Sequence, residues 1–357
     1  MRLEPGQVLG WRLRQNALDS PATTVAGAVE GVVAVRGWPA LLTELAVGVR
    51  QAEPRAGSLQ SELEAGRLVR SYSFRGGSYV MTPEMAAVVL KVRTATQVWE
   101  SARFQRQGGF ALDDWRPFRE AVVEALADGP LTRRELADRL TRIPAWRELR
   151  EAALGAGSDS LYKPLHWWGV ICFGPDRDGA STFRLLDAQA AVPTDAEVDD
   201  AGRRAVRLYL AAYGPATADH LHHWLTDGLS APRRRVDTWV RDLGDAVATV
   251  QVGGTPAHCL TSDLDALASA EPSDSVHLLP GFDPWVMNPG TTDATIVDPA
   301  HRAPASYGAA LVIVGGVVSG TWRARGDEVA LAWFGPRPSG SALAEGMRRL
   351  AAARASG

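Results

Sequence analysis

The stretch GVVAVRGWPALLTEL, residues 31–45, places a single arginine among apolar side chains. Burying the charge of Arg36 without a partner would be costly, because the guanidinium would leave water with nothing in return. Two arrangements avoid that cost. Either the stem of Arg36 packs on Trp38 and its charged end reaches solvent, or Arg36 lines a polar cleft. A guanidinium has only donors, so in a cleft it would contact a phosphate or ligand, or support catalysis, but would not act as the base.

One carboxylate also lies in a setting that suggests chemistry. Asp283 stands between apolar residues in the turn PGFDPW, where it would either orient a water molecule in a cleft or cap its own turn. The histidines at 220, 222 and 223 suggest a metal motif, but only His220 and His223 share a helix face and no carboxylate partner is evident. We therefore expect no metal and no other cofactor.

Arginine carries nearly all the positive charge, because Lys91 and Lys163 are the only lysines in the chain. The formal net charge is −3, which does not by itself indicate a nucleic-acid binder. Codon usage in a GC-rich genome would explain the arginine bias, and so would phosphate recognition by the guanidinium fork. Any case for DNA therefore depends on local clusters, which are Arg70 with Arg75, Arg233 to Arg235, and Arg323 with Arg325.

The elements that would position these residues form a repeat. Gly129-Pro130 and Gly214-Pro215 each end one helical stretch, and Thr132 and Thr217 then provide N-caps for a second helix. Each copy continues into a further helix and then a strand–turn–strand pattern, at 170–186 and at 246–261. A weaker third copy at the front has helical stretches at 23–35 and 58–68 and a hairpin at 68–82.

This order of helices and hairpin is that of the winged helix-turn-helix. We predict an α+β fold of three tandem winged helices, at 1–115, 116–195 and 196–265, enclosing a concave groove. The remaining residues, 266–357, are predicted to form a small C-terminal β subdomain with a turn at 314–317 and a closing helix over 340–355. Winged helices also serve as protein-interaction modules, but three in a row favour an extended DNA surface.

Several longer motifs point to one family. GRLVRSYSFRGGSYVMT, LHWWGVICFGP and HLLPGFDPWVM occur in this order, followed by DPAHR and GVVSGTW. Together they resemble the tandem winged-helix DNA glycosylases of the AlkZ and YcaQ type over nearly the whole chain. The resemblance implies excision of N7-alkylated purines, including bulky adducts and interstrand crosslinks made by antibiotics, and in some members protection of the toxin's producer.

The chain departs from the family pattern at two places. The family positions its attacking water with a Gln-apolar-Gln or Gln-apolar-Asp motif, and the matching residues here are Ala34, Val35 and Arg36. Tyr79 stands where the family often has histidine. We therefore expect Arg36 to support catalysis without acting as the base, and Asp283 to hold the water. The expected DNA contacts are Arg36, Arg70, Arg75, Tyr79, Lys163, Arg233, Arg234, Arg235, Arg302, Arg323 and Arg325.

The leading hypothesis is thus a DNA glycosylase that acts on double-stranded DNA carrying bulky N7-alkylguanine adducts. The rival is a binder that keeps the scaffold without the catalytic motif, and a protein-interaction module ranks last. We expect the protein to be a monomer. We also expect it to lie in the cytoplasm, because no apolar run approaches the ~20 residues of a membrane helix and the first ten residues lack an apolar signal core. A content of 46% hydrophobic and 22% charged residues agrees with a globular protein.

Overall fold

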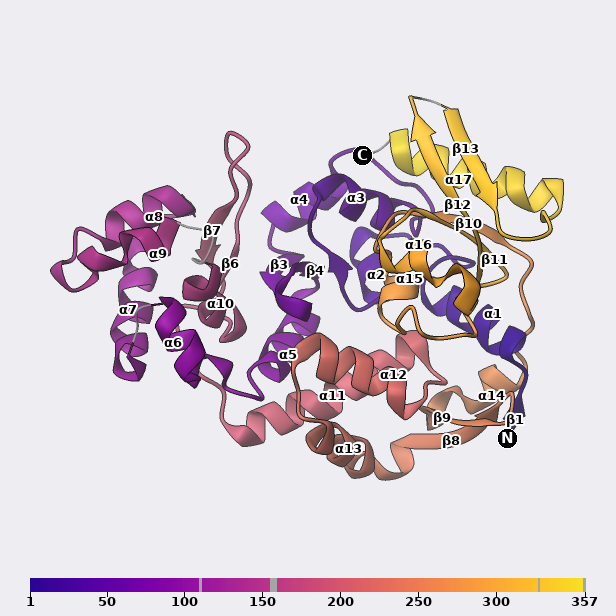
Figure 1. Cartoon of the computed structure of the whole chain (residues 1–357), viewed down its shortest axis with the longest axis horizontal. Helices are drawn as coiled ribbons and strands as arrows, with labels where there is room; N and C mark the ends of the chain where they lie inside the picture. The colour runs from indigo at the N-terminus through magenta and orange to yellow at the C-terminus, as the bar shows by residue number, and fades with distance from the viewer. Residues whose placement is uncertain (109–110, 155–158, 327, 356–357) are drawn as a thin grey trace.

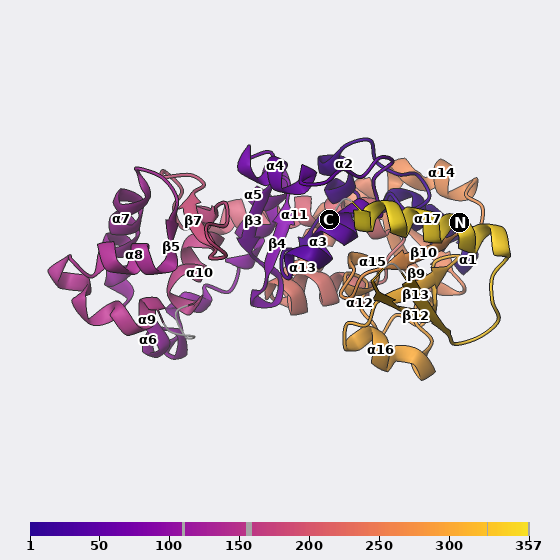
Figure 2. The same ribbon diagram turned by 90° about the horizontal axis from the view of Figure 1, so that it is seen from above.

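The computed structural model describes residues 1–108, 111–154, 159–326 and 328–355, which form a small lobe and a larger body (Figure 1). A view turned by 90° shows the lobe and the body side by side along the longest axis (Figure 2). The lobe contains α6 (Ala102–Gly108), α7 (Trp115–Leu126), β5 (Leu131–Thr132), α8 (Arg133–Leu140), α9 (Arg150–Leu154), α10 (Asp159–Trp167), β6 (Ile171–Phe173) and β7 (Thr182–Leu185).

The part of the body next to the lobe is built from the first third of the chain. Thr24 caps the first of its helices by accepting a hydrogen bond from the Gly27 backbone. That helix ends at Glu30, earlier than the sequence suggested, with Gly31 at its C-cap, and Val33 then takes a left-handed backbone conformation with φ 66° that no helix continues. Its elements are α2 (Val25–Glu30), β2 (Val35–Arg36), α3 (Ala40–Gly48), α4 (Ser58–Glu64), β3 (Val69–Tyr72), β4 (Ser78–Met81) and α5 (Pro83–Arg93).

Helix starts in the lobe follow the predicted capping chemistry. Thr132 accepts from the backbone of Glu135, and the carboxylate of Glu135 accepts from the backbone of Thr132, so both orphan donors at the start of α8 are satisfied. The hairpin of β6 and β7 pairs Ile171 with Leu185 and Phe173 with Phe183. The strand–turn–strand expectation for 170–186 is therefore correct.

The hairpins of the first two predicted units form one sheet. Its strand order is β2-β4-β3-β6-β7-β5, and the two hairpins meet where Arg70 of β3 pairs with Phe173 of β6. His166 of α10 lies against this junction, fully buried, with its Nδ1 3.0 Å from the hydroxyl of Ser71. The lobe is thus joined to the body by backbone pairing as well as by side chains.

We expect acid to weaken this junction through His166. Burial lowers the pKa of His166 to about 3, with Arg133, Lys163 and Arg70 adding to the effect, whereas the unfolded chain titrates near 6.5. Because the folded state binds fewer protons between these values, stability is lost as the pH falls below about 6.5. The slope is about 1.4 kcal/mol per pH unit.

Urea denaturation at a series of pH values tests this expectation. His166→Gln keeps a hydrogen-bonding group opposite Ser71 but does not titrate, so its stability should depend less on pH. Between pH 6.5 and 5 the parent should lose about 2 kcal/mol more than the variant. Equal pH dependence in both proteins would show that His166 does not titrate on unfolding.

The lower part of the body in Figure 1 is built from residues 195–268 together with the N-terminus. Thr194 and Thr217 cap α11 and α12, and the short strand β1 pairs in parallel with β8 of the third hairpin. The elements are β1 (Arg2–Leu3), α1 (Pro5–Gln15), α11 (Asp195–Tyr213), α12 (Ala218–His222), a π-helical turn (His223–Gly228), α13 (Arg233–Asp242), β8 (Val247–Val252), β9 (Thr255–Leu260) and α14 (Leu264–Ala268).

The C-terminal part is a four-stranded antiparallel sheet with helix α17 packed against β10. Its first turn lies at Gly315-Gly316, both at positive φ, within the predicted 314–317, and α17 coincides with the predicted closing helix. The elements are β10 (Val276–Leu279), α15 (Pro284–Met287), α16 (Arg302–Ser306), β11 (Leu311–Val314), β12 (Val317–Arg325), β13 (Glu328–Trp333) and α17 (Gly340–Ala355).

The fold is therefore the mixed helix-and-sheet class that the sequence predicts. Three parts of the chain show helices followed by a hairpin, yet their division into three winged helices with boundaries near 115, 195 and 265 stays a prediction. No helix among the described residues is long and apolar enough to span a bilayer.

Candidate functional site

Arg36 ends β2 at the edge of the six-stranded sheet and is half-buried. Its Nε donates a 3.0 Å hydrogen bond to the carbonyl oxygen of Trp38, and its guanidinium carbon lies 4.3 Å from the centre of the Phe282 ring. The hydroxyl of Thr43 donates to the carbonyl oxygen of Arg36 over 2.6 Å and so fixes the strand end. A stacked guanidinium held through Nε keeps its two terminal amino groups as a planar pair of donors, the geometry that suits phosphate.

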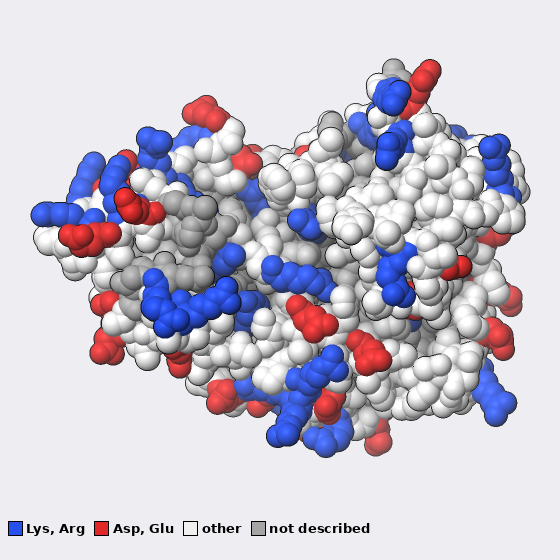
Figure 3. Space-filling model, in the orientation of Figure 1, with Lys and Arg blue, Asp and Glu red and all other residues white. Residues whose placement is uncertain are grey.

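A cavity of about 330 Å³ lies beside Arg36, between the lobe and the body. We call it the arginine cavity. Arg70 contributes from β3, where it also pairs with Asp176 at 2.7 Å and stacks on the Phe173 ring at 4.9 Å. Figure 3 shows basic side chains in the hollow between the lobe and the body. The lining consists of Arg36, Arg70, Arg133, Trp38, Tyr72, Phe173, Gly37, Gly77, Ser78 and Ser181. Three guanidinium groups around one opening favour an anionic ligand such as a DNA backbone.

The two departures from the family pattern are neighbours in the structure, because Arg36 and Tyr79 are cross-strand partners. Burial raises the pKa of Tyr79 although Arg75 and Arg36 oppose the shift, so its phenol is neutral at physiological pH.

His223 lies next to Arg75 and Asp227. Arg75 Nη2 lies 2.7 Å from Nε2 of His223, whose Nδ1 faces Asp227 at 3.8 Å. Burial and the charge of Arg75 lower the pKa of His223, which favours a neutral ring. These contacts link four side chains, which are Tyr79, Arg75, His223 and Asp227.

Asp283 does not face a cleft, which corrects the role expected for it. Its carboxylate accepts two hydrogen bonds from Arg50, at 2.6 and 2.8 Å, and one from the Trp285 backbone at 2.9 Å. Both side chains of the ion pair are fully buried. The alternative, in which Asp283 caps its own turn, describes what the structure shows. Sealed from solvent, Asp283 has no surface with which to hold an attacking water molecule.

Asp283 does, however, shape the site indirectly. The residue before it, Phe282, adopts a left-handed backbone conformation with φ 61°. A Cβ on Gly308 would come within 2.2 Å of the Phe282 ring, so only glycine leaves room for the ring beside it. The buried Arg50–Asp283 pair and Gly308 thus hold the ring on which Arg36 stacks.

The arginines at the start of α13 differ in their surroundings. Arg234 is exposed, and Arg233 Nη1 lies 3.3 Å from Nδ1 of His222. Arg235 is instead held internally, with its Nε 2.6 Å from Asp199 and its Nη1 3.1 Å from Asp195. An arginine engaged by two carboxylates is poorly suited to a phosphate contact, so the expectation for Arg235 changes while Arg233 and Arg234 stay predicted DNA contacts.

The other predicted DNA contacts lie apart from one another. Lys163 on α10 stands 5.2 Å from the centre of the Tyr72 ring, next to the arginine cavity. Arg302 donates through Nε to the Thr291 carbonyl oxygen at 2.9 Å. The exposed residues of the β12–β13 hairpin include Arg323 and Arg325. The structure thus gathers Arg36, Arg70, Arg75, Tyr79 and Lys163 around the lobe–body junction and places Arg302, Arg323 and Arg325 on the C-terminal part.

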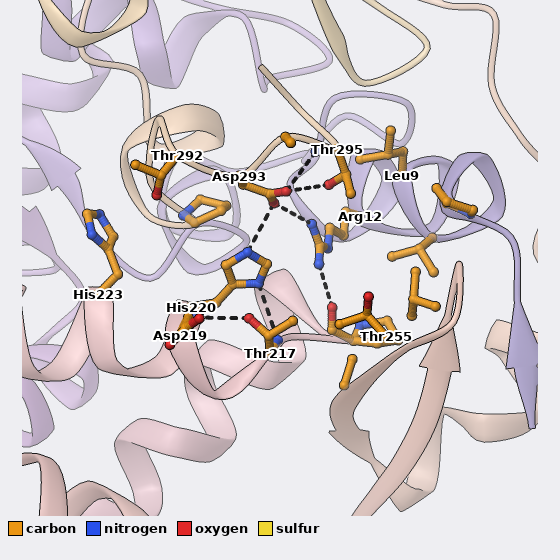
Figure 4. Close-up of a pocket in the computed structure, with 17 residues that line it drawn as sticks. Leu9, Arg12, Thr217, Asp219, His220, His223, Thr255, Thr292, Asp293 and Thr295 are labelled. Atoms are coloured by element: carbon orange, nitrogen blue, oxygen red, sulfur yellow. Dashed lines mark hydrogen bonds and ion pairs between the residues drawn. The ribbon is translucent and has the colours of Figure 1, made fainter. Parts of the chain in front are cut away.

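A second cavity, of about 380 Å³, lies between α1, α12 and the loop before α16 (Figure 4). Asp293 stands at its centre, 3.3 Å from Nε2 of His220 and 3.7 Å from Nη1 of Arg12. Burial alone would raise the pKa of Asp293, but His220 and Arg12 outweigh it and hold the pKa well below its usual range. This carboxylate is ionised and engaged by two partners from different elements, so it ties the N-terminal helix to α12.

The three histidines suspected of metal binding have separate partners. His220 faces Asp293, His222 lies 2.7 Å from Asp237, and His223 contacts Arg75. Within the described parts of the chain, no three His, Cys, Asp or Glu side chains come close enough together to hold a metal ion.

Comparison with known proteins decides the family. The model of a family described as DNA glycosylase AlkZ-like matches residues 29–355, nearly the whole chain. The chain belongs to the AlkZ-like DNA glycosylase family. A relative in Streptomyces sahachiroi, an interstrand DNA cross-link repair glycosylase, is 32% identical over 339 residues, which cover 92% of this chain and 90% of the relative. The solved structure of the DNA glycosylase AlkZ from the same organism matches with a TM-score of 0.91 and 29% identity, over 99% of this chain and 98% of that one.

Within this AlkZ-like chain, the segment that aligns with the family's water-positioning motif is largely closed. Ala34 and Val35 are each 1% exposed, so neither presents a polar group or much surface to a ligand. Sequence reasoning missed Arg50, Phe282 and Arg133 as site residues, and it considered His223 only as a metal ligand. Arg133 follows the predicted N-cap Thr132 and so was recognisable as a helix-start cation. The roles of Arg50 and Phe282 depend on contacts with residues more than 200 positions away, which no local pattern reveals.

Proposed function

We propose that this protein is a DNA repair glycosylase that binds double-stranded DNA and hydrolyses the N-glycosidic bond of N7-alkylguanine, including bulky adducts. The arginine cavity carries the proposal. It places three guanidinium groups beside the segment that matches the family's water-positioning motif. The similarity to a cross-link repair glycosylase along 92% of the chain supports the same activity class. A bulky, antibiotic-derived adduct and a role in self-resistance are the finer parts of the proposal.

The reaction needs little general-acid catalysis from the protein. An N7-alkylguanine is already cationic and leaves readily, so the protein must hold the nucleotide, place a water molecule and favour an oxocarbenium-like sugar. Arg36 has no acceptor for a proton of that water, and Asp283 is sealed. The phenol oxygen of Tyr79, the cross-strand partner of Arg36, is neutral and can accept a hydrogen bond. The neutral ring of His223 already accepts at Nε2 from Arg75, so it can hold Arg75 in place but offers no acceptor to a water molecule. We propose Tyr79 as the water-holding group.

A non-catalytic binder is the second candidate, and specific observations favour it. Arg36 offers only donors where the family has an acceptor, Ala34 is buried, and Asp283 cannot replace the lost group. Such a protein would bind or sequester damaged DNA through the same cavity without cleaving it. Binding and excision must therefore be measured separately.

Excision of a single N7-alkylguanine from a duplex tests the proposal. The parent protein should generate abasic sites, detected as alkali-labile strand breaks. Arg36→Gln should weaken binding by roughly tenfold, because one charge-assisted phosphate contact is lost. Its single-turnover excision rate, measured at saturating protein, should stay within about threefold of the parent, since Arg36 is not the base.

The outcomes separate the candidates. Binding with no abasic sites, under conditions where a known glycosylase cleaves the same duplex, makes the protein a non-catalytic binder. A collapse of the single-turnover rate in Arg36→Gln would assign Arg36 to the chemical step. Absence of binding to any duplex would contradict both candidates.

A further inference from the structure

Two large apolar side chains stand in solvent beside the arginine cavity. Trp38 is 68% exposed and Leu41 is 66% exposed, whereas nearly all the tryptophans and leucines of the described chain are buried or half-buried. Trp38 and Leu41 are three residues apart, one before and one after the start of α3, and we call the two together the Trp38 edge.

The backbone under the Trp38 edge is firmly held. The Gly37 backbone donates to the Ser78 carbonyl oxygen at 2.8 Å, and Arg36 Nε donates to the Trp38 carbonyl oxygen at 3.0 Å. Thr43 Oγ1 donates to the Arg36 carbonyl oxygen at 2.6 Å. A Cβ on Gly37 would come within 3.2 Å of the side chains of Arg70 and Ser78, so the loop lies directly on the sheet. These side chains are exposed on a well-anchored turn, and folding alone gives no reason for their exposure.

The neighbours of the Trp38 edge indicate what covers it. Trp38 lines the same cavity as Arg36, Arg70 and Arg133. An apolar edge next to three guanidinium groups fits a ligand that presents phosphates and aromatic rings together, which is nucleic acid. DNA-deforming proteins insert apolar side chains between base pairs while basic residues hold the adjacent phosphates. A base-pair step that contains a damaged base is easier to open, because the damaged base is already less strongly stacked.

We propose that Trp38 and Leu41 enter the base stack of bound duplex DNA next to the lesion, while the arginine cavity holds the phosphates of the same strand. This inference rests on the proposed function, because it presumes that the protein binds double-stranded DNA. Insertion at the lesion step exposes the damaged nucleotide to the residues around Arg36 and Tyr79. The Trp38 edge thereby contributes to selection of damaged over undamaged DNA.

Fluorescence of 2-aminopurine tests the inference, because this base brightens when its neighbours unstack. The duplex carries one 7-methylguanine on a 2′-fluorinated sugar, which resists excision, with 2-aminopurine as its 5′ neighbour. A second duplex has plain guanine at the same place. The proteins are the parent, the double variant Trp38→Ala with Leu41→Ala, and two controls. Leu112→Ala and Tyr307→Ala remove side chains that are 49% and 86% exposed and do not line the cavity.

The parent should brighten 2-aminopurine severalfold on the lesion duplex, and both controls should behave like the parent. The double variant should show little brightening and should bind the lesion duplex about tenfold more weakly, the loss typical of one base–aromatic stack. Its affinity for plain duplex should stay within about twofold, because the phosphate contacts remain. Thermal unfolding should be unchanged, since both side chains are exposed.

Three results would overturn the inference. If the double variant binds the lesion duplex and brightens 2-aminopurine as the parent does, the edge does not enter the stack, and the proposed function is untouched. If sedimentation shows a dimeric parent and a monomeric double variant, the edge joins two copies of the chain instead. If the parent binds no duplex, the proposed function fails and the inference with it.

Discussion

Replacing Arg50 by methionine is expected to lower the free energy of unfolding by about 3–5 kcal/mol, because it leaves the carboxylate of Asp283 buried without its partner. Two hydrogen bonds, at 2.6 and 2.8 Å, disappear together with the compensating charge. Equilibrium urea denaturation measures the change. The double variant Arg50→Met with Asp283→Leu should recover most of the loss, since an apolar pair of similar volume avoids the desolvation of both charges.

Arg55→Met provides the matched control. Arg55 pairs with Glu53 on the surface, where both side chains are about four-fifths exposed, so the same substitution should leave stability unchanged. A loss no larger in Arg50→Met than in Arg55→Met would mean that the ion pair is not buried as described.

Asp283→Asn should lower stability without affecting catalysis. Its excision rate per folded molecule should stay near that of the parent, contrary to what a water-holding carboxylate would give.

Local chemistry explains which parts of the fold the sequence predicts well. The caps at Thr132 and Thr217, the turn at Gly315-Gly316 and the closing helix α17 all depend on residues within a few positions of one another. A threonine oxygen that accepts a hydrogen bond from the backbone N–H three residues on, and a glycine at positive φ, both depend on local backbone geometry. These elements could therefore be placed before any tertiary contact was known.

The parts that escaped prediction depend on distant partners. Asp283 occupies a turn that suits either a cap or a catalytic carboxylate, and only Arg50, 233 residues away, decides between them. The pairing of Arg70 with Phe173 merges two predicted units into one sheet, although each hairpin has a complete pattern by itself. Arg36 was recognised as unusual from its neighbours, but the Phe282 ring beneath it comes from the C-terminal part of the chain.

Neutralising the three arginines of the arginine cavity is expected to reduce affinity for undamaged duplex DNA by at least roughly a thousandfold. Each charge-assisted hydrogen bond to phosphate contributes about 1.5 kcal/mol or more, which is about tenfold. The variant is Arg36→Gln, Arg70→Gln and Arg133→Gln together, and each residue lines the cavity. The slope of log affinity against log salt should become shallower by about 2.7, since each lost phosphate contact contributes about 0.9. Fluorescence anisotropy across a range of salt concentrations measures both quantities.

The control must carry the same change in net charge elsewhere. Arg55→Gln, Arg116→Gln and Arg348→Gln remove three arginines that pair with glutamates on exposed surfaces. If the protein bound DNA only through its overall charge, both triple variants would lose affinity equally. If the cavity holds the phosphates, only the cavity variant has a weaker salt dependence of its DNA affinity. The change should be the same for every DNA sequence, because phosphate contacts carry no base information. A loss confined to particular sequences would instead mean that these arginines read base edges, and the cavity would then face a groove rather than the backbone.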